Sequence, residues 1–307
     1  MIAYIIRRVL WGLGVLAGVA AITFVLRYLV PADPARIIAG PHATPQALAA
    51  IRHHYGFDRP LLGQAVAYLD NLRHGDLGPS LAFGEAPVGS ILLARAGPTL
   101  ELALAGLLVE LLIGIPLGVL AALRHRSVTD RAAVLLALCG FSTPTFWLGP
   151  VLIGLFAVHW RLFPAGGDEG ALALALPALT LGLAGAAWYT RLIRSSMLDV
   201  LSSEYIRTAR AKGLSWGRVV RTHALRNALT PIITQIGLDM AYFLGGVIVV
   251  ETVFGWPGIG QAASIGIAND DPNLIMGAVL FGAIAVVLAN LIVDLCYAVV
   301  DPRVRLR

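Results

Sequence analysis

Six long apolar stretches set the limits on what this chain can fold into. They lie at residues 9–30, 98–122, 132–158, 173–194, 229–253 and 275–299. A helix needs roughly 20 apolar residues to cross the hydrocarbon core of a bilayer. The chain is 58% hydrophobic and only 13% charged, which leaves too little polar surface to cover a soluble globule. We therefore expect an all-α polytopic membrane protein with six transmembrane helices.

The two ends of the first stretch favour an uncleaved span. Arg7 and Arg8 precede an apolar run that continues to Val30. A secretory signal peptide has a shorter apolar core and a small-residue cleavage site. The two cysteines, Cys139 and Cys296, lie in apolar runs, which is typical of small buried hydrophobic residues.

The distribution of basic residues predicts the orientation. Most of the 23 Lys and Arg residues fall in the segments that share a side with the N-terminus. The segments on the other side are longer and hold most of the acidic residues. Short basic segments stay in the cytoplasm, so both termini are expected to be cytoplasmic. The net charge of +5 then reflects cytoplasmic segments, and we expect the lipid bilayer, not nucleic acid, as the surrounding partner.

This orientation divides the chain into predicted parts. Residues 1–30 form an N-terminal tail and the first span, and 31–97 form a periplasmic cap. Residues 98–300 form a five-helix core with a cytoplasmic loop at 199–228, and 301–307 form a cytoplasmic tail. Within the cap, Thr44 and Gly56 bound a short predicted helix, with Thr44 as N-cap. A second predicted helix, PLLGQAVAYLDNLRHG, is amphipathic and too short to span.

The segment Glu204–Ile232 interrupts the apolar pattern with charge. It contains seven ionisable groups within 23 residues by our count, including Lys212, the only lysine of the protein. Placing these groups at the bilayer centre costs on the order of 17 kcal/mol, at about 2.5 kcal/mol each. The segment is therefore predicted to lie outside the membrane, on the inner side.

The same segment carries the signals of two short helices. Gly213 is placed to end the first helix at the C′ position, and Ser215 is a candidate cap for the second. Pro231 fits the first turn of the fifth span, where a missing N–H costs little. Ala209 and Gly213 are four residues apart, so one face carries almost no side chains and permits a partner's backbone to approach closely.

These residues resemble a known family. Glu204, Ala209, Ala211, Gly213, Leu229 and Pro231 are similar to the EAA loop of binding-protein-dependent ABC importers. EYIRTARAKGLS with HALRNALTPIIT resembles more closely the permeases for dipeptides, oligopeptides, glutathione and nickel. The segments VPADPARIIAG, HGDLG, PTLELA, GGVIVVETVFGWPGIG and DPRVR extend the resemblance over nearly the whole chain. Tyr205 and Ile206 depart from the alanines of the broad consensus.

The resemblance implies a fold and partners. It implies an inner-membrane permease subunit of the type I ABC importer kind, paired with a second permease. Two cytoplasmic ATPases and a periplasmic binding protein complete the importer, and the EAA loop seats in an ATPase cleft. Short peptides are the expected substrate, and nickel chelates or glutathione remain alternatives.

The sequence contains no phosphate-binding loop of its own. Such a loop requires a lysine after a glycine-rich turn, and Arg210 and Ala211 precede the only lysine. We therefore expect no catalytic residue and no cofactor in this chain, with ATP and Mg bound by the partner ATPases. A secondary transporter or channel acting without ATPases is the alternative from a different class. That alternative predicts broken helices in two related halves, whereas the sequence indicates one break, at Ser142–Pro144.

Polar residues inside spans mark candidate positions along the translocation path. Glu110 and Asp239 are the deepest, and Glu251 lies near the outer end of its span. Gly245 and Gly246 interrupt the fifth span and are interpreted as loosening the helix or permitting close packing beside the path. Burial of the acids in helix–helix contacts is the alternative. The histidines lack the spacing of metal ligands, so no metal site is expected.

Overall fold

The structure, a computed structural model, describes residues 2–29, 35, 43–54, 56, 58–244 and 247–300. Side chains are described within these ranges except at 2–5, 26–29, 54 and 294–300. The long helices are α1 (Ile2–Leu29), α5 (Val88–Leu123), α8 (Ala175–Leu201) and α15 (Pro272–Val300). The shorter α-helices are α3 (Pro45–His54), α4 (Leu61–Arg73), α6 (Val128–Ser142), α7 (Thr145–Leu152), α9 (Glu204–Ala211), α10 (Trp216–Arg218), α11 (Leu225–Ala228), α12 (Thr230–Leu244), α13 (Ile248–Phe254) and α14 (Ile259–Ala268). Two π-helices, η1 (Ile153–His159) and η3 (Val219–Ala224), and one 3-10 helix, η2 (Ala171–Leu174), complete them.

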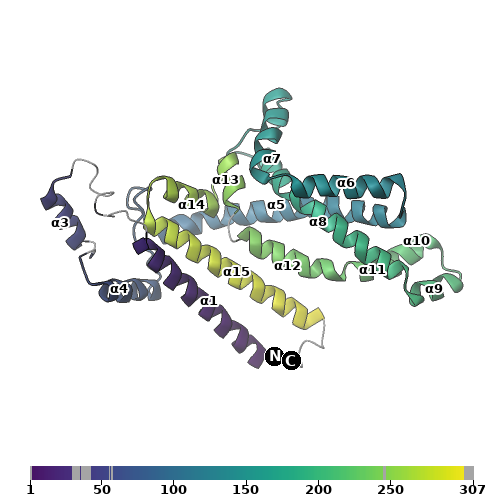
Figure 1. The fold of residues 1–307 in the computed structure, drawn as a ribbon, viewed down its shortest axis with the longest axis horizontal. Helices are drawn as coiled ribbons and strands as arrows, with labels where there is room; N and C mark the ends of the chain where they lie inside the picture. Colours follow the sequence, from purple (N-terminus) through teal and green to yellow (C-terminus); the bar gives the residue numbers. More distant parts are fainter. Residues whose placement is uncertain are drawn as a thin grey trace.

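The all-α architecture predicted from the apolar stretches is confirmed. Among the described residues, four helices are long and apolar enough to cross a membrane, or six if each of two bent pairs counts as one span. Figure 1 shows α3 and α4 at one end of the molecule and α9 and α10 at the other. The helix predicted after Thr44 is present, and the Thr44 side chain accepts a hydrogen bond from the Ala47 N–H at 3.2 Å.

Two predicted spans are bent. The predicted third span consists of two segments, α6 and then α7 with η1. The two segments meet at an angle of 102°. Pro144 cannot continue the hydrogen-bond ladder of α6, and the Thr143 hydroxyl bonds back to the Cys139 carbonyl at 2.7 Å. The fifth consists of α12 and α13, at 58° to each other. The sequence indicated a break at Ser142–Pro144 in the third span. In the fifth span it indicated a looser helix at Gly245 and Gly246, which fall between α12 and α13 and lie outside the described residues.

Helices α5 and α8 form the centre of the fold through close backbone contact. A Cβ atom added to Gly114 would lie 2.9 Å from the Ala186 carbonyl oxygen, and one at Gly118 would lie 2.7 Å from that of Thr190. Small residues four apart let membrane helices approach in this way. The pair at 114 and 118 is a packing signal that our sequence interpretation missed. Helix α5 also begins at Val88, well before the apolar stretch that starts at Pro98.

Helices α1 and α15 lie side by side along one edge of the molecule (Figure 1). Gly12 of α1 lies against Val287 of α15, where an added Cβ would be 2.7 Å from a methyl carbon. Most described side chains of α1 are exposed. The helix is therefore held by one narrow face, and its remaining apolar surface suits contact with lipid.

Candidate functional site

The helix α9 is terminated by a Schellman motif. Gly213 has a φ of +81°, its N–H bonds to the Arg210 carbonyl at 2.9 Å, and the Leu214 N–H bonds to the Ala209 carbonyl at 3.4 Å. These bonds satisfy carbonyls that the last turn leaves without partners. Leu214 also packs on the cluster that contains Ala209. The sequence prediction that Gly213 ends this helix is confirmed.

The apolar face of α9 packs on η3, within its own chain. Ile206 and Ala209 are 2% and 7% exposed, and they share a cluster with Val219 and Val220. The face at Ala209 that we interpreted as open to a partner is therefore covered by this chain. The interpretation was wrong for Ala209 because the alanine permits η3, not a partner, to pack closely. Gly213 remains exposed.

Two side-chain contacts fix α9 relative to the helices that follow. The Asn227 amide donates to the Tyr205 hydroxyl at 3.0 Å, and the Arg210 guanidinium lies 5.0 Å from the centre of the Trp216 ring. Ser215 occupies the N-cap position of α10, as predicted, but its side chain makes no capping hydrogen bond. The turn is instead held by Leu214, which packs on the buried cluster that contains Ala209.

The remaining EAA-like residues divide between surface and core. Glu204 is exposed and accepts a hydrogen bond from Arg207 at 2.8 Å, one turn along the helix. Ala211 is exposed, and Leu229 packs at the edge of the cluster. Pro231 is exposed in the first turn of α12, as predicted. The exposed set thus forms a rigid surface at one end of the molecule (Figure 1).

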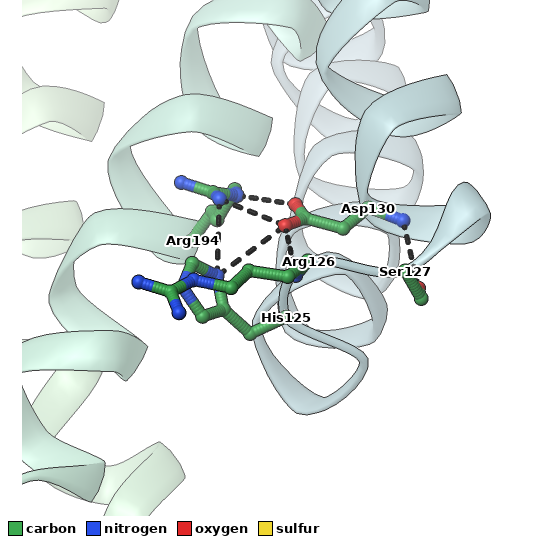
Figure 2. A network of polar contacts seen from close by, with 5 residues as sticks. All are labelled: His125, Arg126, Ser127, Asp130 and Arg194. Carbon is green, nitrogen blue, oxygen red and sulfur yellow. Dashed lines mark hydrogen bonds and ion pairs between the residues drawn. The ribbon is translucent and has the colours of Figure 1, made fainter.

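An ion-pair network joins the turn between α5 and α6 to α8, at the same end (Figure 2). Asp130 is 3% exposed and accepts two bonds from Arg194, to Nε at 2.5 Å and to Nη2 at 2.9 Å. The Arg126 N–H donates to the same carboxylate at 2.8 Å, and His125 Nδ1 lies 3.3 Å from it. Ser127 caps α6 by accepting from the Asp130 N–H at 3.3 Å. Sequence analysis missed this network, because its partners are 64 residues apart.

The two deepest acids occupy one polar cluster between α5, α8 and α12. Asp239 of α12 accepts hydrogen bonds from the Tyr189 hydroxyl at 2.5 Å and from the Gln235 amide at 2.8 Å. Glu110 of α5 is 3% exposed, packs directly against Gly185 of α8, and has one carboxylate oxygen without a hydrogen-bond partner. The sequence singled out both acids but not Tyr189, whose hydroxyl donates to Asp239.

Glu251 anchors the short helix α14. Its carboxylate accepts from the Thr99 hydroxyl at 2.8 Å and from the Gln261 N–H at 2.9 Å, in the first turn of α14. Negative charge is favourable at a helix N-terminus. Glu251 is fully buried, although it lies near the predicted outer end of its span. Helix α14 itself was not predicted, since its apolar run of ten residues is too short to span.

His53, one of the exposed histidines, pairs with a nearby carboxylate. His53 Nδ1 lies 2.9 Å from Asp58 Oδ2, and this hydrogen bond holds the pKa of the Asp58 carboxyl below its usual value. Within the part of the chain that the structure describes, no group of three or more His, Cys, Asp or Glu side chains is placed to hold a metal ion.

Comparison with known proteins identifies the class. Residues 114–306 match the family described as binding-protein-dependent transport system inner membrane component, and residues 1–92 match the N-terminal part described for such membrane components. The chain belongs to this family. It is an all-α, multi-pass inner-membrane protein and a transport permease, a class that is not itself catalytic.

Individual relatives agree with this class over their full length. The chain is 38% identical to the dipeptide transport system permease protein DppB of Escherichia coli (strain K12), covering 99% of both chains. It is 40% identical to the glutathione transport system permease protein GsiC of Salmonella choleraesuis (strain SC-B67), with the same coverage. A solved inward facing structure of the MetNI methionine ABC transporter has a TM-score of 0.60 at 19% identity, and covers 69% of this chain and 96% of that one. The fold is that of an ABC transporter permease.

Proposed function

We propose that this chain forms half of the translocation path of an ATP-driven importer for short peptides. The observation that carries the proposal is the rigid, exposed helix α9, held by Gly213 at the opposite end of the molecule from α3 and α4 (Figure 1). A preformed helix end loses little conformational entropy when a partner binds. Family membership and the 38% identity to a dipeptide permease support the substrate class.

The proposed assembly contains a second homologous permease, two ABC ATPases and a periplasmic binding protein. ATP and Mg are bound by the ATPases, since the sequence of this chain lacks a phosphate-binding loop. Residues 199–228 form the coupling loop, in which Glu204, Ala211 and Gly213 meet the ATPase. Ala209 and Leu229 position that surface from within the fold, and Pro231 adds an exposed position in the first turn of α12. No nucleic acid takes part.

The predicted orientation belongs to this proposal. Both termini and α9 face the cytoplasm, and residues 31–97 cap the periplasmic side, where the binding protein docks. Glutathione is the alternative substrate, and it is supported by the 40% identity to a glutathione permease. Nickel chelates are a further alternative within the same architecture.

A cross-linked pull-down tests the assembly. The tagged chain is extracted from its native membrane in mild detergent after cross-linking, and proteins and small molecules are identified by mass spectrometry. We expect two ATPases, a second permease and a binding protein loaded with a short peptide. Recovery of the chain alone, or only with itself, contradicts the coupling role of α9. If the binding protein carries glutathione or a nickel chelate, the chain is still part of an importer, but the proposed substrate is wrong.

A further inference from the structure

The polar cluster between α5, α8 and α12 contains a polar atom that its neighbours do not satisfy. Glu110 is 3% exposed, yet its Oε2 atom has no hydrogen-bond partner. Burying a carboxylate without a donor is costly, and it is more so within a membrane span. The other side of the carboxylate is closed, because it packs on Gly185. The site therefore has an unused acceptor and no room for a protein donor on the Gly185 side.

The nearby groups are acceptors or are already bonded. Asp239 uses one lone pair on each oxygen for Tyr189 and Gln235, so further acceptor positions remain. Tyr189 is fully buried and donates its only proton to Asp239. Glu110 packs on Gly185, one turn before Tyr189 on the same helix, so α8 places the two carboxyl groups in one cluster. No cation among the described side chains bonds to either of them.

Access to the cluster is from the side of α12. Gln235 and Asp239 are both partly exposed, whereas Glu110 and Tyr189 lie behind them. Asp239 is therefore the acid of the pair that a ligand can contact from the surface of this chain. The ligand must carry positive charge and at least two hydrogen-bond donors.

We infer that Glu110 and Asp239 form a binding site for a primary ammonium group. Such a group carries three donors on one small cation, which matches the free oxygen of Glu110 and the remaining lone pairs of Asp239. The inference rests on the proposed function in one respect, since short peptides carry this group at their N-terminus. The two acids then hold the amino end of the substrate while it crosses the membrane.

Binding of a simple amine tests the site without transport. The purified permease complex is heated in butylammonium chloride, in tetramethylammonium chloride, which has no N–H donor, and in sodium chloride at equal ionic strength. We expect butylammonium alone to raise the melting midpoint. Glu110→Gln removes this shift, with about tenfold weaker binding for the lost charged hydrogen bond. Glu101→Gln, on the exposed side of the same helix, retains it.

Asp239→Asn provides a second variant if Glu110→Gln does not accumulate in the membrane, and it is expected to lose the shift as well. Equal shifts in all three salts, or a butylammonium shift that survives both substitutions, overturns the inference. Peptide uptake by proteoliposomes is measured alongside. If wild-type proteoliposomes take up no peptide while the butylammonium shift is present, the proposed function fails and the amine site stands.

Discussion

Gly213 is the residue on which the shape of the α9 surface depends most directly. Its φ of +81° lies in the left-handed region, and no other atom lies within 4 Å of the position that a Cβ would take. A side chain at this position would be unfavourable because of the left-handed backbone conformation, and not because of crowding by neighbouring atoms. Non-glycine residues in this region cost about 1–2 kcal/mol.

We expect Gly213→Val to abolish ATP-driven uptake while the protein remains in the membrane at normal abundance. The strain unwinds the end of α9, and the added side chain projects from the exposed surface. Uptake in vesicles and immunoblotting of membranes measure the two quantities. Gly217→Ala is the control, since Gly217 also has open space but lacks a positive φ. Normal uptake by the Gly213 variant at normal abundance contradicts the coupling role.

Glu251 is a residue whose role is structural. We expect Glu251→Ala to lower the stability of the protein by about 3 kcal/mol, because it leaves the Thr99 hydroxyl and the Gln261 N–H without an acceptor. Glu251→Gln keeps one acceptor oxygen and is expected to be intermediate. Thermal unfolding in detergent measures both. Glu101→Ala, at an exposed position, is the control and is expected to unfold like the wild type. Equal unfolding midpoints for the wild type and all variants rule out the role of Glu251 in anchoring α14.

Among the elements, α8 connects the centre of the fold to α9, and the network in Figure 2 fixes its C-terminal half to the α5–α6 turn. We expect Asp130→Asn to cost about 3 kcal/mol, because it leaves the Arg194 guanidinium without its buried partner. A double-mutant cycle with Arg194→Gln isolates the pair. The exposed pair of Glu204 and Arg207 is the control, with an expected coupling below about 1 kcal/mol. If the losses in the free energy of unfolding of the two single variants simply add in the double variant, the Asp130–Arg194 pair does not stabilise the fold.

How well each element could be predicted depended on whether its signals are local. Thr44 and Gly213 carry their structural signals in their own residue types, and both helix ends were predicted. Helix α14 is held by contacts between distant residues, such as Glu251 with Thr99, and the sequence did not predict it. The candidate site was only partly predicted for the same reason. Glu110 and Asp239 were recognised as acids inside spans, but the hydrogen bond from Tyr189 of α8 to Asp239 depends on how the helices pack.

At the scale of the whole molecule, the orientation can be measured through one residue. Lys212 is the only lysine, and it is exposed just after α9. We expect a membrane-impermeant amine reagent to label the Lys212 peptide in inside-out vesicles and to leave it unlabelled in intact spheroplasts. Mass spectrometry of the digested protein separates this peptide from the N-terminal amine. Labelling in intact spheroplasts reverses the predicted orientation.

The break at Pro144 has a consequence for how the protein is made. Helix α6 has 15 residues and rises only about 22 Å, which is less than the roughly 30 Å of a hydrocarbon core. The translocon therefore cannot release α6 into lipid as a finished span. We expect residues 128–159 to enter as one apolar unit and the 102° turn to form once α8, synthesised later, offers the surface on which α6 and α7 pack. The bent third span is then a product of late assembly within the membrane.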